Sequence, residues 1–480
     1  MSPFFRFLLT PLRHPLPWLL LQVISVFLAL QTGGLLEPKM VPDTASYRQL
    51  AEARTLERAL SSHRTNGYPF FLKAIGHRRD GEFGGSHARY TYRVFRKIPT
   101  VHAVVFLASI LLFWWSVRVY TGSPWLAFAM ATPLPYAEIW GLVRRVQPDF
   151  LAAALALVTV SLFILLTTRP RALTWAGLTV VLFLTYQVRP AYLFLVVLLP
   201  LMGPVLRWVA HGEPRTRLIH FGIGLLAATL LPLFLFCGVR WLVVRDFRLV
   251  PFGGHNSIGI AASLLDREVV KSLDRHQPLA TGILERRESR GMEPIALGSD
   301  TRLWHGEHNA NVWGIAVPVA FQRVKTAKKR QRRAEPPARA PRIEANRLLS
   351  ELSVDIFRRK PWHYLQWVWD SFLFCLNLTL ADNWIRWPAI LIALSVLFRL
   401  LARAGPALLS MEPRDLERRR RLLALAALGF GFFLAHGLIV VLVDVPYQRF
   451  VYAMYLLLPS VLCGVLFELW RPTQRQTADS

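Results

Sequence analysis

The sequence predicts an all-α protein that crosses a membrane several times. Hydrophobic residues make up 53% of the 480 residues, and the mean hydropathy is +0.34, both higher than a soluble protein with one apolar core requires. The apolar residues are gathered in blocks of roughly 20 residues with few charges, the length that a helix needs to cross the hydrocarbon layer. We therefore expect a polytopic bundle of about ten transmembrane helices and a large extracytoplasmic loop with short helices.

Apolar windows give the positions of the expected spans. The windows are residues 15–35, 98–117, 125–143, 150–167, 173–188, 191–208, 218–240, 384–402, 422–443 and 450–469. A cytoplasmic N-terminus places Arg169, Arg171 and the arginines at 418–421 on the inner side, where basic residues are preferred. Both termini are then cytoplasmic, and the first window is a retained anchor, because no small-residue cleavage site follows it. We expect the protein in the inner membrane of a Gram-negative cell.

This topology divides the chain into three modules. An N-terminal transmembrane module spans residues 1–240 and includes a first extracytoplasmic loop at 36–97. An extracytoplasmic loop region follows at 241–363, and a C-terminal module with an interfacial helix and further transmembrane helices covers 364–480. The block at 362–380 is rich in tryptophan, which favours the headgroup layer, so this block either lies in the interface or crosses the membrane.

The formal net charge of +27 would suggest a nucleic-acid partner in a soluble protein. In a membrane protein, basic loops also set the orientation and contact anionic lipid, so we expect membrane lipid as a partner and no nucleic acid. Part of the charge lies at 323–342, where basic residues and prolines predict a solvated, flexible segment. The cysteines Cys237, Cys375 and Cys463 lack the spacing of a disulfide framework or a metal site.

Asp43 begins the polar part of the first outer loop. It precedes the helix-forming stretch at 44–53 and stands where an N-cap residue would stand. A helix N-terminus also favours an ionised carboxylate, so the same position presents an anionic base at the membrane surface. The residues alone allow both interpretations.

Two motifs of this loop resemble a known family. Residues 42–47 read P-D-T-A-S-Y, and residues 64–72 read R-T-N-G-Y-P-F-F-L. A first membrane helix followed by these motifs resembles the GT-C superfamily of membrane glycosyltransferases, especially the bacterial relatives of protein mannosyltransferases and the aminoarabinose transferase (glycosyltransferase family 39). The resemblance implies a GT-C-like helical bundle and a polyprenyl-phosphate-linked sugar as the donor. It also implies that Asp43 is the general base.

Arginines recur in the short outer loops, where the positive-inside rule does not recruit them. They are Arg144, Arg145, Arg189 and Arg449. Each is explained singly by snorkelling at the interface, but a guanidinium group also binds a phosphate through two parallel hydrogen bonds. We expect some of these arginines to bind the lipid phosphate of the donor. Tyr447 lies two residues before Arg449, where the family resemblance implies an arginine and an aromatic residue ahead of the last helix.

Three further polar positions have more than one interpretation. Asp149 is either a second acidic group of the site, an N-cap of the next helix or an ion-pair partner of Arg145. His255 and Asn256 follow the seventh window, and they either contact the acceptor or form an ordinary polar turn.

These observations together predict an inverting glycosyltransferase that moves a sugar from a polyprenyl-phosphate donor to a hydroxyl group on an extracytoplasmic lipid, glycan or protein. Asp43 would take the proton of the acceptor, and the outer arginines would stabilise the departing phosphate. Tyr47, Arg64 and Tyr68 would shape the donor pocket. A flippase or transporter of a lipid-linked substrate is one alternative, and a glycan ligase or polymerase is another. No metal site is indicated, and the need for a divalent ion is left open.

Overall fold

The structure confirms the all-α class for the part of the chain that it describes. The computed structural model describes residues 14–77, 94–331, 340–401 and 413–471. Within these residues the regular elements are helices, and the β-pairing is limited to one isolated parallel bridge between Lys39 and Arg145.

Six helical stretches are long and apolar enough to cross a membrane. They are α2 (Pro15–Thr32), α7 (Lys97–Thr121), α9 (Pro148–Thr168), η4 (Pro190–Phe194) with α11 (Leu195–His211), α12 (Arg215–Val244) and α21 (Pro413–Val443). Two bent helix pairs raise the number to eight if each pair is one span. The described residues therefore form a helical membrane protein with six to eight candidate spans.

The bent pairs lie in the C-terminal part of the chain. They are α19 (Pro361–Ala381) with α20 (Asn383–Leu401), bent by 82°, and α22 (Gln448–Met454) with α23 (Leu458–Trp470), bent by 41°. One contact joins the two bends, because the hydroxyl of Tyr455 donates a hydrogen bond of 2.7 Å to Oδ2 of Asp382. The other carboxylate oxygen of Asp382 accepts a hydrogen bond of 2.7 Å from the backbone N–H of Trp384 and so caps α20.

Fewer candidate spans are found than the ten expected, and the differences have physical reasons. The window at 125–143 is divided into α8 (Pro124–Ala131), η2 (Leu134–Tyr136) and η3 (Glu138–Leu142). Pro133 and Pro135 lie at this break, and neither has the backbone N–H that a continuous helix needs. The window at 173–188 forms α10 (Ala172–Val188), whose 17 residues are fewer than the roughly 20 of an average membrane-spanning helix. The count of ten remains a prediction.

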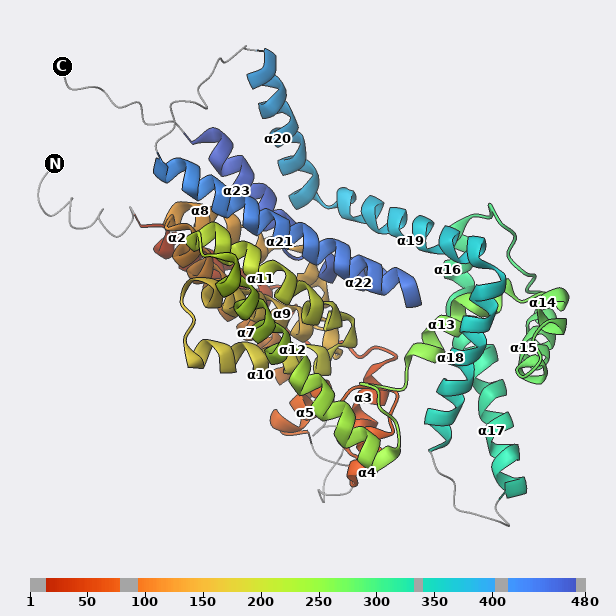
Figure 1. Cartoon of the computed structure of the whole chain (residues 1–480). Coiled ribbons are helices and arrows are strands. Elements are labelled where there is room, and N and C mark those ends of the chain that lie inside the picture. The colour runs from red at the N-terminus through yellow and green to blue at the C-terminus, as the bar shows by residue number, and fades with distance from the viewer. Residues whose placement is uncertain (1–13, 78–93, 332–339, 402–412, 472–480) are drawn as a thin grey trace, which may run out of the picture.

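The N-terminal helices form the main bundle (Figure 1). α7 packs against α9, α9 against α10, and α11 against α12. Most residues of α9 are buried, as expected for a helix that is apolar on all sides. α2 and α23 both pack against α8, so the first and last described helices meet at the same element.

Three short helices follow α2 in the loop at 36–97, here called the first outer segment after its expected side of the membrane. They are α3 (Thr44–Ala51), α4 (Leu56–Leu60) and α5 (Gly67–Ala74). The backbone N–H of Lys39 donates to the carbonyl of Arg144 at 2.7 Å, and the N–H of Val146 donates to the carbonyl of Lys39 at 3.0 Å. This pairing fixes the start of the segment against the residues that precede α9.

Gly67 fixes α5 against the end of α10. A Cβ atom at Gly67 would lie 2.5 Å from the backbone nitrogen of Val188 and 2.6 Å from the carbonyl oxygen of Gln187. Only glycine fits such a close approach of two backbones. Arg189 directly follows α10, so this contact also places Arg189 beside the first outer segment.

The helices between α12 and α19, here called the second outer segment after their expected side of the membrane, form a compact unit with its own apolar core. Its elements are α13 (Gly253–Ala261), η5 (Ala262–Leu264), α14 (Arg267–Lys271), α15 (Gln277–Glu288), α16 (Thr301–Asn309), the π-helix η6 (Ala310–Ala316), α17 (Val317–Gln331) and α18 (Pro341–Arg359). α13 packs closely against α18, and α17 also packs against α18. Figure 1 shows this unit beside the main bundle, with α19 leading from it to α20.

Both ends of the segment expected to be flexible, 323–342, are helical in the structure. α17 continues to Gln331 and α18 begins at Pro341, because lysine, arginine and glutamine favour a helix and Val324 is buried against the core of the unit. The remaining residues, 332–339, which include the prolines at 336 and 337, lie outside the described part of the chain.

Candidate active site

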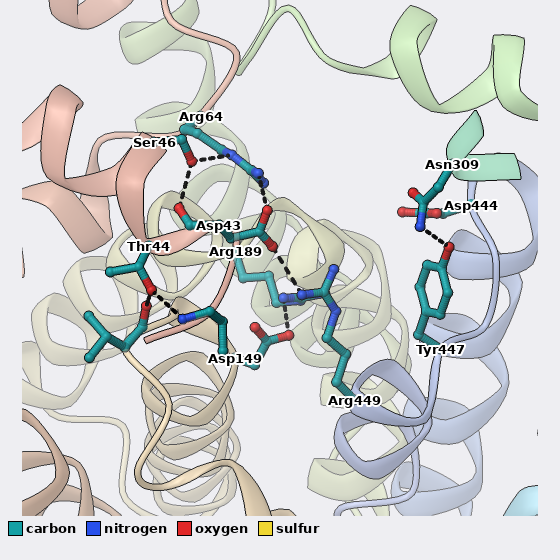
Figure 2. Close-up of polar contacts among 12 residues, drawn as sticks. Asp43, Thr44, Ser46, Arg64, Asp149, Arg189, Asn309, Asp444, Tyr447 and Arg449 are labelled. Carbon is teal, nitrogen blue, oxygen red and sulfur yellow. Dashed lines mark hydrogen bonds and ion pairs between the residues drawn. The ribbon is translucent and has the colours of Figure 1, made fainter. Parts of the chain in front are cut away.

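Asp43 forms two ion pairs with arginines from distant parts of the chain (Figure 2). Its Oδ1 lies 2.5 Å from Nη2 of Arg64, and its Oδ2 lies 3.0 Å from Nη1 of Arg449. Arg64 precedes α5, whereas Arg449 belongs to α22. Ser46 orients Arg64, because its hydroxyl oxygen accepts a hydrogen bond of 3.1 Å from Nε of Arg64. Asp43 is therefore the point where the first outer segment meets α22.

The position of Asp43 at the start of α3 does not make it a capping group. It occupies the N-cap position, but its side chain accepts no hydrogen bond from the helix backbone. Its two carboxylate oxygens contact the arginines instead. Of the two interpretations that the sequence allows, the structure favours the anionic group over the cap.

The charges around Asp43 keep its carboxyl group ionised. Burial raises the pKa of Asp43, but the charges of Arg64 and Arg449 and their hydrogen bonds outweigh burial and lower this pKa below 3.8. Such a carboxylate is a weak base while both arginines contact it. Removal of one arginine from Asp43 would raise its basicity.

A third ion pair lies beside the two that Asp43 forms. Nη1 of Arg189 donates to Oδ1 of Asp149, in the first turn of α9. Asp149 is only 2% exposed, and its partner is Arg189 rather than Arg145. It is not an N-cap either, because Gln147 occupies that position. The structure therefore brings two carboxylates and three arginines together, and within these five side chains one positive charge is in excess. The carboxyl group of Asp444, whose pKa burial raises, also interacts with Arg189 and Arg449.

The ring of Phe450 contacts both Arg189 and Arg449. Its ring centroid is 4.4 Å from the guanidinium carbon of Arg189 and 4.9 Å from that of Arg449. A cation gains about 0.5–2 kcal/mol over an aromatic face, more when water is excluded. Phe450 therefore helps to hold two like charges side by side. The sequence reasoning did not single it out, although it directly follows Arg449.

Tyr47 and Tyr68 pack behind Asp43. Their ring centroids are 5.3 Å apart, and the guanidinium group of Arg64 lies 5.0 Å from the ring centroid of Tyr47. Burial raises the pKa of both hydroxyl groups, so both are neutral. The hydroxyl of Tyr68 is buried and has no hydrogen-bond partner among the described residues, and the same holds for Tyr192 beside Arg189. Both hydroxyl groups therefore lack the partner that a buried polar group normally has.

Tyr447 links the charged cluster to a second polar group, because its ring centroid lies 5.9 Å from the guanidinium carbon of Arg449 and 5.8 Å from the ring centroid of Phe450. Its hydroxyl accepts a hydrogen bond of 2.7 Å from Asn309 at the end of α16. Asp444 lies next to it and accepts a hydrogen bond of 3.1 Å from Asn256 of α13, while burial raises the pKa of Asp444. Figure 2 shows this group apart from the ion pairs around Asp43. The sequence reasoning did not single out Asp444, whose partners come from a distant segment.

Arg144 and Arg145 are not part of the ion pairs. Their backbone pairs with Lys39, and neither side chain forms an ion pair within the residues that the structure describes. Nε of Arg144 is buried without a hydrogen-bond partner there. The same described residues hold no group of three or more histidine, cysteine or acidic side chains placed to bind a metal ion.

Comparisons with known proteins give no relative of this chain. No protein-family model matches it, and neither does any curated protein or solved structure. The geometry of Asp43, Asp149 and the three arginines therefore carries the functional argument.

Proposed function

We propose that the protein is a membrane glycosyltransferase that uses a polyprenyl-phosphate sugar and acts at the outer face of the inner membrane. The observation that carries this proposal is the convergence of Asp43 and Asp149 with Arg64, Arg189 and Arg449 from separate parts of the chain. Partly buried ion pairs often stabilise a fold no more than apolar packing of the same volume would, and clusters of such charges are typical of functional sites. The acceptor is an extracytoplasmic lipid, glycan or protein with a free hydroxyl group.

The excess positive charge supports an anionic donor. Guanidinium groups bind phosphate through paired hydrogen bonds, and Arg189 and Arg449 stand side by side on the ring of Phe450. In our proposal the phosphate of the donor contacts these two arginines. They then stabilise the negative charge that grows on the phosphate as its bond to the sugar breaks.

Donor binding would also activate Asp43. When the phosphate takes over Arg449, the carboxylate loses one of its two cationic partners, and the pKa of Asp43 rises towards its ordinary value. The acceptor oxygen then attacks the anomeric carbon from the face opposite the phosphate and gives its proton to Asp43, while the phosphate departs with the bonding electrons. The product has the inverted configuration. Tyr47, Arg64 and Tyr68 line the donor side in this proposal.

A flippase for a lipid-linked substrate is the second candidate. The bends between α19 and α20 and between α22 and α23 favour it, because transporters bind substrates at broken helices. A glycan ligase or polymerase would share the donor chemistry but transfer a chain.

The first experiment measures the release of free polyprenyl phosphate by the purified protein in liposomes. A panel of polyprenyl-phosphate sugars serves as donor, a membrane extract serves as acceptor, and Asp43→Asn is compared with wild type. We expect release with one sugar and its loss in Asp43→Asn. Asp274→Asn, in the exposed loop before α15, is the matched control and keeps full activity.

Two outcomes would contradict the proposal. Undiminished release of polyprenyl phosphate by Asp43→Asn would show that Asp43 is not the general base. Movement of labelled donor lipid between leaflets, without release from any donor, would favour the flippase.

A further inference from the structure

Four aromatic rings meet where the first and second outer segments touch. They belong to His63, Phe252, His255 and Trp313, here called the ring cluster. The ring centroid of His63 lies 5.9 Å from that of Phe252 and 6.0 Å from that of Trp313. The centroids of His255 and Trp313 are 5.9 Å apart. The cluster joins the stretch before α5 to α13 and η6.

The ring cluster borders the ion pairs around Asp43. The guanidinium carbon of Arg64 lies 5.5 Å from the ring centroid of Phe252, and the same guanidinium group contacts Asp43. A ligand on the ring cluster would therefore lie next to the carboxylate that we propose as the base.

His255 has hydrogen-bonding capacity that the protein does not use. The residue is 3% exposed, and neither ring nitrogen has a partner among the described residues. Burial lowers the pKa of His255 to about 4 and that of His63 to about 3, so both rings are neutral near pH 7. A buried polar group without a partner points to a missing ligand or water. Neutral imidazoles offer one donor and one acceptor each and suit an uncharged polar ligand.

Trp313 is presented by an unusual piece of backbone. It lies in the π-helix η6 and is 45% exposed. π-helical turns are rare and occur often at functional sites. Asn311 of η6 accepts a hydrogen bond of 2.5 Å from the buried Arg287 and donates one of 2.8 Å to Ser263. These contacts hold η6 in place although the large ring of Trp313 remains exposed.

We propose that the ring cluster binds an uncharged sugar ring of the acceptor. Aromatic rings pack against the apolar C–H faces of a sugar, while neutral imidazoles exchange hydrogen bonds with its hydroxyl groups. A purely apolar ligand would leave the nitrogens of His255 without partners. The proposal rests on the proposed function and narrows its acceptor to a molecule with a neutral sugar beside the reacting hydroxyl.

The test measures binding directly, without turnover. Methyl glycosides of glucose, galactose, mannose and N-acetylglucosamine are added to the full-length protein in nanodiscs, and saturation-transfer NMR reports which of them bind. We expect at least one glycoside to bind to wild type and to Asp43→Asn. Its affinity should fall roughly tenfold in Trp313→Ala, as expected for the loss of one aromatic contact.

Matched variants separate binding from folding. Trp362→Ala removes a tryptophan that is 71% exposed on α19, and binding should be unchanged. Trp313→Phe keeps an aromatic ring and should restore most of the affinity, whereas His255→Leu keeps the volume and should weaken binding. The subsite would be overturned if no glycoside bound to wild type. It would also be overturned if Trp313→Ala and His255→Leu both bound the glycoside as tightly as wild type.

The failure of the subsite differs from the failure of the transferase. If sugar transfer occurs and the KM for the acceptor is unchanged in Trp313→Ala, the subsite is wrong and the proposed function stands. If no donor is turned over but glycoside binding depends on Trp313, the subsite stands and the transferase is wrong.

Discussion

Arg449 contacts two different parts of the site. Its Nη1 lies 3.0 Å from Oδ2 of Asp43, and its guanidinium carbon lies 4.9 Å from the ring centroid of Phe450. Lysine cannot reproduce this arrangement, because its ammonium group is a compact charge without a planar face. The conservative exchange of arginine for lysine is therefore not conservative at this position.

Arg449→Gln should reduce donor use while the fold is kept. The variant loses one cation beside the phosphate, and by comparison with a lost transition-state donor kcat/KM falls roughly 10²-fold. Arg449→Lys should recover only part of this loss. The measurement is polyprenyl phosphate release at varied donor concentration. If the loss of activity came with a matching loss of folded protein, seen as a lower melting temperature, Arg449 would have a structural role.

His255 should make the protein sensitive to mild acid. Burial and, to a smaller extent, the charge of Arg342 lower the pKa of His255 from 6.5 to about 4. Between these values the unfolded chain binds a proton that the folded protein does not. The stabilising effect of the neutral ring is complete above pH 6.5 and is lost as the pH falls towards 4.

The comparison of wild type with His255→Gln tests this dependence. From pH 7 to pH 5, wild type should lose roughly 2 kcal/mol more unfolding free energy than His255→Gln. Thermal unfolding in detergent at both pH values gives the difference. His220→Gln, an exposed histidine of α12, should behave as wild type. A constant difference between wild type and His255→Gln at both pH values would show that the folded protein protonates His255 normally.

At the level of elements, the site depends on how short helices are fixed to long ones. α5 is held against the end of α10 by the close approach at Gly67. α13 is held against α18 in the same way, because a Cβ atom at Gly254 would lie 2.1 Å from the carbonyl oxygen of Asn346. The first contact places Arg64 and Arg189 near each other, and the second places His255.

Gly67→Ala adds only one methyl group, but it should lower activity strongly. The added methyl group meets backbone that cannot rotate away, which costs about 1–3 kcal/mol and displaces α5 from α10. We expect a large loss of donor turnover in liposomes together with a modest fall in melting temperature. Gly141→Ala is the matched control, because nothing lies within 4 Å of a Cβ atom there. Full activity in Gly67→Ala would contradict the proposed link between α5 and the site.

The sequence indicates elements better than it indicates their partners. Apolar length is a local property, so α2 lies within its expected window, and α7, α9, α12 and α21 cover theirs and extend beyond them. Breaks such as that after α8 depend on where prolines fall within the packed bundle.

The members of the site were also easier to propose than their pairing. In the sequence, Arg145 was the expected ion-pair partner of Asp149, but in the structure the partner is Arg189. Trp313 was not singled out, because its position depends on a π-helix and on packing against His63 and Phe252 from distant parts of the chain.

For the whole molecule, orientation decides whether the site meets the outer medium. In a variant with alanine at Cys237, Cys375 and Cys463, one new cysteine is placed at position 303 or 171. Leu303 is 58% exposed on α16, and Arg171 precedes α10. With both termini in the cytoplasm, an impermeant maleimide added to intact cells should label Leu303→Cys and not Arg171→Cys. The reverse pattern would invert the topology and place the site inside.

The pair of Asp43 and Arg449 also constrains the biogenesis of the protein. The two residues are 406 positions apart, and a ribosome delivers the chain from its N-terminus. Asp43, Asp149 and Arg189 therefore enter the membrane long before Arg449 and Phe450 have been translated. A message cut short between the codons for Arg189 and Arg449 yields a chain that holds both carboxylates but lacks Arg449 and Phe450. Under the proposed function, such truncated products are expected to be inactive.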